Sequence, residues 1–190
     1  MQGRSIDAPL NETGKIQAKA VASYLENETL DKIVSSSMQR ARQTAEPLLR
    51  LQKNNTEFIS HKDLDEMDFG KFEGKKYRDC KYEIEQVHKR WVGGDTSYRI
   101  PGGESPEEVW HRAGKRAGYY LDHFAGKSIA FVIHGRVIRI LLSVWTGLGL
   151  RNMHRIEHAN GAINRLKYSG KSFEVIYLNR ISHLSGQGSS

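Results

Sequence analysis

A short apolar run in the second half of the chain sets the strongest limit on its fold. Residues 128–133 (SIAFVI) are followed at once by His134 and Gly135, and then by a helical pattern over 136–146. A continuous apolar run of this length is typical of a strand that is buried on both faces of a parallel sheet. Because this strand leads directly into a helix, the segment predicts an α/β fold.

Further segments alternate between strand and helix patterns. The expected helices cover 13–26, 38–50, 75–91 and the stretch after Ser105, and the expected strands cover 32–35, 58–60, 162–168 and 173–179. Ser105-Pro106-Glu107-Glu108 has the residues of a capping box with proline at the first helical position. We therefore expect a three-layer α/β/α sandwich, with a mostly parallel central sheet and helices on both faces.

The first expected helix has a defined cap and an apolar face. Thr13 is the expected cap. The apolar face is expected to consist of Ile16, Val21, Tyr24 and Leu25. The loop 61–74 separates the strand at 58–60 from the helix at 75–91. The sequence thus predicts a helix that packs on the sheet through its large apolar side chains.

Composition limits the number of domains and the partners. With 190 residues and 38% hydrophobic content, we expect one domain over 1–184 and a disordered tail over 185–190. The single cysteine, Cys80, indicates a reducing compartment, so we expect a cytoplasmic protein. No apolar run reaches the length of a membrane span, which is about 20 residues. The net charge of +7 admits anionic partners. The basic residues are scattered, so we expect neither a nucleic-acid nor a membrane partner.

His134 lies where an α/β fold is expected to place its chemistry. Ligands of open α/β sheets bind at the carboxyl ends of the strands, and His134 directly follows the apolar strand. The free N–H groups at the start of the next helix favour an anion. An imidazole can also contact a phosphoryl oxygen and transfer a proton. The alternative is a histidine that merely ends the strand.

Two other segments place charged groups in comparable positions. Arg40 lies in the first turn of the helix that follows the strand end at 35–37, and its planar guanidinium matches phosphate oxygens. The acidic loop 64–74, which contains Glu66, can hold a carboxylic acid beside a pocket, and a nearby phosphate dianion would raise the pKa of such a group and let it protonate a leaving alkoxide. A surface arginine and a solvated acidic turn are the open alternatives.

Taken together, these segments resemble the histidine-phosphatase superfamily, which includes phosphoglycerate-mutase-like enzymes and their phosphatase relatives. The resemblance runs nearly from end to end, with the motifs in the family's order. They are Gln2-Gly3 with 7–18, Ser35–Ala45, Leu64–Gly74, Pro101–Ser105, His134–Arg139, Asn160-Gly161, and Leu178-Asn179 with His183-Leu184.

The resemblance implies a role for individual residues. His134 would be the second histidine of the phosphate pocket, Arg40 a clamp on the phosphate and Glu66 the proton donor. The substrate-binding positions would be Gln2, Gly3 and Gly135. The reaction would pass through a phosphohistidine, which divides one difficult transfer into two easier steps. No metal or organic cofactor is implied, and the partner would be a small phosphorylated substrate.

One motif of the family is missing. The family's nucleophilic histidine lies in an Arg-His-Gly tripeptide at the end of the first, central strand, and the 190 residues contain no such tripeptide. Loss of a central strand would leave two strands with unpaired edges, at about 1–3 kcal/mol for each buried polar group. We therefore expect the nucleophile upstream of Met1. A strand lent by another chain and a degenerate pseudoenzyme are the alternatives.

The expected function is a phosphatase acting on a small phosphorylated metabolite. Hydrolysis is favoured because the stretch from Gly74 to Pro101 is short, whereas the mutases that it resembles carry a longer insertion there. A mutase needs such loops to keep water from its phosphoryl group. The alternatives are a phosphoglycerate mutase and a catalytically dead protein that binds phosphorylated ligands.

Overall fold

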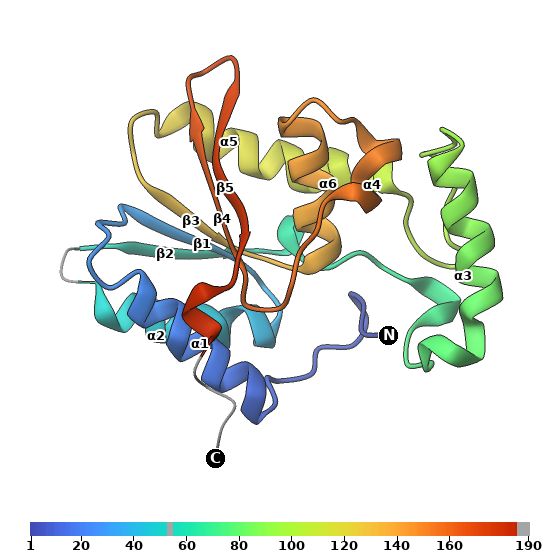
Figure 1. Cartoon of the computed structure of the whole chain (residues 1–190), viewed down its shortest axis with the longest axis horizontal. Coiled ribbons are helices and arrows are strands. Elements are labelled where there is room, and N and C mark those ends of the chain that lie inside the picture. Colours follow the sequence, from blue (N-terminus) through green and yellow to red (C-terminus); the bar gives the residue numbers. More distant parts are fainter. Residues whose placement is uncertain (53–54, 186–190) are drawn as a thin grey trace.

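A computed structural model describes residues 1–52 and 55–185 of the chain, and the end of the tail expected at 185–190 lies outside these residues. Three parallel strands form the sheet, in the order β2-β1-β3 (Figure 1). They are β1 (Lys32–Ser36), β2 (Glu57–His61) and β3 (Ile129–Val132). In this register Val34 lies opposite Ile59 on one side and Phe131 on the other. The predicted parallel sheet is confirmed.

Helices cover both faces of the sheet. Figure 1 shows α1 (Glu12–Tyr24) and α2 (Gln39–Leu51) on one face, and α5 (Lys115–His123) and α6 (Gly135–Trp145) on the other. Successive residues of a strand point to opposite faces. Ile33 accordingly packs in the cluster that holds α1 and α2 residues, and Val34 packs in the cluster that holds α5 and α6 residues. The three-layer fold class is therefore confirmed.

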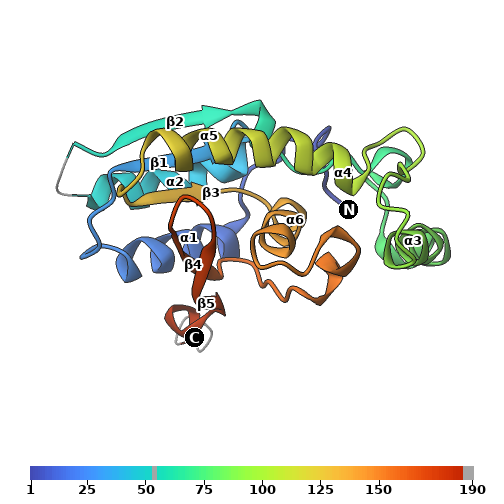
Figure 2. The same cartoon turned by 90° about the horizontal axis from the view of Figure 1, so that it is seen from above.

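The helix after Ser105 begins as the capping box predicts. The Ser105 hydroxyl accepts the Glu108 backbone N–H at 3.2 Å, and the Glu108 carboxylate accepts that of Ser105 at 2.9 Å. This helix runs through α4 (Pro106–Val109), a π-helical turn over Trp110–Gly114, and α5. The remaining helix, α3 (Tyr77–Val92), lies beyond the ends of the strands (Figures 1 and 2).

The expected cap of the first helix was wrong, and its expected apolar face was wrong at Ile16 and Tyr24. Asn11, rather than Thr13, caps α1 by accepting the backbone N–H three residues further on at 2.8 Å. Ile16 and Tyr24 are 41% and 37% exposed. The buried residues of this helix are Ala18, Ala20 and Ala22. Small side chains let α1 approach its neighbours closely, while Leu25 at its C-terminal end packs against the cluster that holds α1 and α2 residues.

The expectation that the 128–133 strand is buried on both faces was also wrong. All four residues of β3 are only half-buried, whereas all five residues of β1 are buried. Among the described residues β3 pairs with β1 alone, so its other edge is open. The antiparallel hairpin of β4 (Ile163–Tyr168) and β5 (Phe173–Arg180) forms a separate sheet and lies on the open side of β3 (Figure 2).

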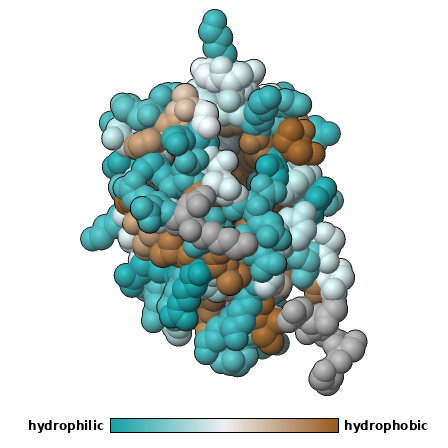
Figure 3. Space-filling view, turned by 90° about the vertical axis from the view of Figure 1, so that its left-hand side faces the viewer, coloured by the Kyte–Doolittle hydropathy of each residue, from teal (hydrophilic) through white to brown (hydrophobic). Residues whose placement is uncertain are grey.

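Side-chain contacts attach the hairpin to the rest of the domain. Phe173 stacks on Trp145 of α6, with ring centroids 4.7 Å apart, and Arg165 pairs with Glu28 at 2.7 Å. The face shown in Figure 3 is largely hydrophilic, with apolar side chains in separate groups. Within the described part of the chain, no helix combines the length and apolar character that crossing a membrane requires.

Candidate active site

His134 lies at the carboxyl end of β3, as expected, and is 7% exposed. Its Nε2 is 2.8 Å from the hydroxyl of Ser36, which ends the neighbouring strand β1. Carboxyl ends of parallel strands meet at one edge of a sheet, and this brings together two residues that are far apart in the sequence. The structure therefore places His134 at the position where ligands of this fold class bind.

The hydrogen bonds of Ser36 determine the tautomer of His134. The Ser36 hydroxyl donates its one proton to Asp65 Oδ1 at 2.7 Å, because a carboxylate only accepts. The Ser36 oxygen must then accept the hydrogen bond from His134, so Nε2 is the ring nitrogen that carries the hydrogen. Asp65 also accepts the Ser37 backbone N–H at 2.9 Å. The chain from Asp65 through Ser36 holds the imidazole in one orientation, and Nδ1 has no hydrogen bond to residues 1–52 or 55–185.

His134 is neutral in this setting. Burial lowers the pKa of His134 from 6.5 to about 3, and the positive charges of Arg40 and Arg112 add to this effect. A dianionic phosphate beside the ring would act in the opposite direction, because an anion favours the charged imidazolium. His134 is thus arranged to gain a proton when a phosphate group arrives.

Arg40 lies in the first turn of α2, where the sequence predicts it. Its guanidinium donates to the carbonyl oxygens of Ile6 at 2.8 Å and Gly3 at 3.3 Å. These bonds hold the N-terminal loop against the ends of the strands. The Arg40 charge also lowers the pKa values of His134 and Glu66. The three predicted catalytic residues are therefore neighbours, and their chemical roles stay predictions.

Glu66 is buried, with 8% exposure. Its Oε1 accepts the Met67 backbone N–H at 2.8 Å, and its Oε2 accepts that of Arg136 at 3.3 Å. Burial raises the pKa of Glu66, and these hydrogen bonds and the charges of Arg136 and Arg40 only partly oppose that rise. The raised pKa shifts Glu66 toward its protonated form, which is the form that a proton donor needs.

Arg112 is a residue of the site that the sequence analysis missed. Its guanidinium binds both carboxylate oxygens of Glu104, at 2.7 and 2.8 Å. It also donates to the backbone carbonyls of Asp63, Asp65 and Glu66 at 2.7–3.0 Å. These contacts hold the acidic loop in place. The π-helical turn that carries Arg112 has no local sequence signature, although such turns often mark functional sites.

The three predicted substrate-binding positions differ in their surroundings. Gly3 is buried, and a Cβ there would lie 2.1 Å from the carboxylate of Glu73 and 2.8 Å from the Met67 carbonyl, so only glycine fits. Gln2 is exposed at the start of the same loop. Gly135 opens α6, and a Cβ there would make only an ordinary contact. Substrate binding at all three positions stays a prediction.

A match to a family model shows to which protein family the chain belongs. Residues 1–181 match the model of the histidine phosphatase superfamily (branch 1). The chain belongs to this family. The prediction of the family from sequence motifs is thereby confirmed.

Individual relatives agree with this assignment. A Hydrogenobacter thermophilus protein named "Putative phosphoserine phosphatase 2" is 29% identical over 185 residues, which cover 96% of this chain and 88% of the relative. A Yersinia pestis protein named "Probable phosphoglycerate mutase GpmB" is 32% identical over 168 residues, covering 88% and 77%. A solved mycobacterial glucosyl-3-phosphoglycerate phosphatase, in complex with inorganic phosphate, has a TM-score of 0.80 at 24% identity, covering 97% and 93%. This structural likeness confirms the fold.

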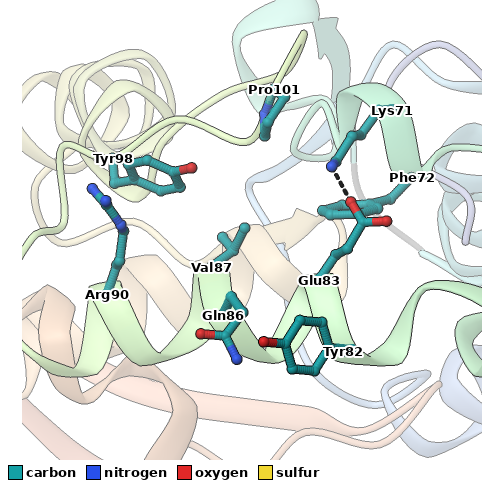
Figure 4. A pocket seen from close by; sticks show the side chains of 9 residues that line it. All are labelled: Lys71, Phe72, Tyr82, Glu83, Gln86, Val87, Arg90, Tyr98 and Pro101. Atoms are coloured by element: carbon teal, nitrogen blue, oxygen red, sulfur yellow. Dashed lines mark hydrogen bonds and ion pairs between the residues drawn. The ribbon is translucent and has the colours of Figure 1, made fainter.

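A separate hollow lies outside this histidine-phosphatase site. It has a volume of about 180 Å³ and lies between α3 and the segments 71–72 and 98–101 (Figure 4). Lys71 pairs there with Glu83, and the Arg90 guanidinium lies 4.2 Å from the Tyr98 ring centre. None of the residues predicted to be catalytic lines it. Among the described residues, no cluster of three or more His, Cys, Asp or Glu is arranged to hold a metal ion.

Proposed function

We propose that this protein is a phosphatase that hydrolyses a small phosphorylated metabolite at the site around His134. The observation that carries the proposal is that the site contains both a neutral His134 in a fixed orientation and a buried Glu66 whose pKa is raised. Arg40 adds a positive charge beside both. The relatives support the substrate class, because their names include phosphoserine and glucosyl-3-phosphoglycerate phosphatases.

The proposed reaction has two steps. A histidine nitrogen attacks the phosphorus, the ester P–O bond breaks, and Glu66 gives its proton to the leaving oxygen, which releases the alcohol. Water then attacks the phosphohistidine, Glu66 takes a proton from that water, and the N–P bond breaks to yield inorganic phosphate. Arg40 and His134 stabilise the negative charge on the phosphoryl oxygens in both steps.

We further propose that the nucleophilic histidine lies on a strand that docks along the open edge of β3. Three observations support this. The apolar residues of β3 are only half-buried, and the hairpin of β4 and β5 lies beyond the open edge (Figure 2). Arg139 Nε on α6 is buried without a hydrogen-bond partner among the described residues. A docked strand would cover β3, pair its free backbone groups and offer carbonyl oxygens to buried donors.

Extending the chain tests this proposal. Hydrolysis of p-nitrophenyl phosphate is measured for the 190-residue chain and for the same chain with the genomic sequence upstream of Met1 restored. We expect activity in the extended form alone, because only that form would hold the nucleophile. Activity in neither form would favour a phospho-ligand-binding pseudoenzyme. Equal activity in both forms would show that the nucleophile lies within the 190 residues.

Replacing Glu66 by glutamine is expected to have an effect that depends on the leaving group. An alkoxide needs a proton to leave, so hydrolysis of glycerol phosphate should fall by about 10²–10⁴-fold. Nitrophenolate leaves without a proton, so kcat/KM for p-nitrophenyl phosphate, which reports only the first step, should fall far less. Wild-type activity should decline once Glu66 loses its proton, and the raised pKa of Glu66 places this decline at a higher pH than for an ordinary carboxyl group. The glutamine variant has no such proton to lose, so its activity should lack this decline. Equal losses for both substrates would contradict the role as a proton donor.

Mutase chemistry is the second candidate function, because one relative at 32% identity is named as a phosphoglycerate mutase. Hydrolysis is favoured because the residues between Gly74 and Pro101 form only α3 and a short loop. Incubation with 3-phosphoglycerate separates the two, since a phosphatase releases inorganic phosphate and a mutase forms the 2-phospho isomer.

We also propose a cytoplasmic location, which the single, free and buried Cys80 supports.

A further inference from the structure

Arg136 extends from the catalytic edge of the sheet toward α3. It is the second residue after His134 and lies in the first turn of α6. Its backbone N–H binds Glu66 Oε2 at 3.3 Å. Its guanidinium carbon lies 5.8 Å from the ring centre of Trp91, a buried residue near the end of α3. The guanidinium therefore occupies the region between the proposed proton donor and α3.

The guanidinium of Arg136 lies over the Trp91 ring but has no hydrogen-bonding or ion-pair partner in the part of the chain that the structure describes. Within residues 1–52 and 55–185 it makes no side-chain hydrogen bond and no ion pair, although the residue is half-buried. Arg112 differs, because its guanidinium is fully engaged by a carboxylate and backbone carbonyls. An unpaired cation in a partly buried position is costly. Burial lowers the pKa of Arg136, and attraction to Glu66 only partly opposes this, so an incoming anion would stabilise it.

The position of Arg136 relative to Glu66 indicates which part of a substrate it meets. If Glu66 protonates the leaving oxygen, as the proposed function requires, the carbon skeleton of the substrate begins at Glu66. Arg136 borders Glu66 on the side toward Trp91. Its guanidinium would thus contact the carbon skeleton rather than the phosphate, which Arg40 and His134 hold.

We propose that Arg136 binds a carboxylate on the substrate, so that the enzyme prefers phosphate monoesters of hydroxy acids. This inference rests on the proposed function. A planar guanidinium matches a carboxylate with two parallel hydrogen bonds. A singly charged group suits this position better than a second phosphate, because Glu66 adjoins it. Phosphoserine and phosphoglycerate, which appear in the names of relatives, both carry a carboxylate.

Paired ligands test the inference on the chain without requiring turnover. O-phosphoserine and O-phosphoethanolamine differ only in the carboxylate, and calorimetric titration gives the dissociation constant of each. For wild type we expect phosphoserine to bind about 10- to 100-fold more tightly, the range that one charge-assisted hydrogen bond contributes. Arg136→Met should remove this preference, with a much larger loss of affinity for phosphoserine than for phosphoethanolamine. Arg136→Lys should keep part of the preference, because lysine retains the positive charge but cannot form the two parallel hydrogen bonds of a guanidinium.

Arg90→Met is the matched control. Arg90 precedes Trp91 in α3, but its side chain lies beside Tyr98 in the separate hollow (Figure 4). This variant loses the same charge and should keep the full preference. Thermal melting of each variant tests whether it is folded. If Arg136→Met does not fold, Arg136→Lys takes its place in the comparison.

Each result has a distinct meaning. Equal binding of the two ligands to wild type would leave the phosphate site intact and overturn the carboxylate subsite. A preference that survives in both Arg136 variants would also overturn it, since another residue would then bind the carboxylate. Failure of both the 190-residue chain and its upstream-extended form to bind either ligand or inorganic phosphate would instead overturn the proposed function, and the subsite with it.

Discussion

Replacing His134 by alanine is expected to lower the rate of phosphate-monoester hydrolysis by about 10²–10³-fold, the usual cost of removing one preorganised donor to a developing negative charge. The physical reason is that His134 is held in a single orientation by Ser36 and Asp65, so no other side chain can replace its contact with the phosphoryl oxygens. Steady-state kinetics of the form that hydrolyses p-nitrophenyl phosphate measure this effect, which should appear mainly in kcat.

The matched control for this prediction is His123→Ala. His123 is exposed near the end of α5 and stacks on Tyr119, and the site does not involve it. Its replacement should leave the rate unchanged. If His134→Ala retained most of the wild-type rate, the site would have to be placed elsewhere in the fold.

His134 also makes a pH-dependent contribution to stability. Its pKa is about 3 in the folded protein and near 6.5 in the unfolded chain, because burial disfavours the charged ring. Between these values only the unfolded state binds the proton, so wild-type stability falls as the pH is lowered from 6.5 toward 3. Denaturation of His134→Ala over the same range should show a shallower decline.

The second large effect is expected for Arg112→Ala. Removing this side chain leaves the half-buried Glu104 carboxylate and several backbone carbonyls of the acidic loop without their donor. Breaking a buried pair by removing one partner costs about 3–5 kcal/mol of unfolding free energy. The loop carries Glu66, so hydrolysis should fall together with stability. Urea denaturation of wild type and variant measures the difference.

Arg116→Ala is the control for Arg112→Ala on the same helical segment. Arg116 pairs with the single carboxylate of Asp63, and its side chain is 33% exposed. A pair of this kind contributes about 0–1 kcal/mol. A loss for Arg112→Ala no greater than that for Arg116→Ala would show that the loop does not depend on Arg112.

Local patterns in the sequence determined the elements of the fold and the first members of the site. The apolar run before His134 predicted β3 and the helix after it, and the capping box at Ser105 predicted where α4 begins. Periodicity and caps depend on residues within a few positions of one another, so they can be read without the fold. The placement of His134 and Arg40 at the ends of elements followed from the same local signals, whereas Glu66 was singled out by the resemblance to the family.

The tertiary structure decided what these elements bury and how the site is held. The outward turn of Ile16 and the half-burial of β3 depend on which neighbours each element meets. The bonds of Ser36 to His134 and of Arg112 to the acidic loop join residues that are 46 to 98 positions apart. Nothing in a local pattern records such pairs, because their hydrogen bonds form only after packing has brought the strand ends together.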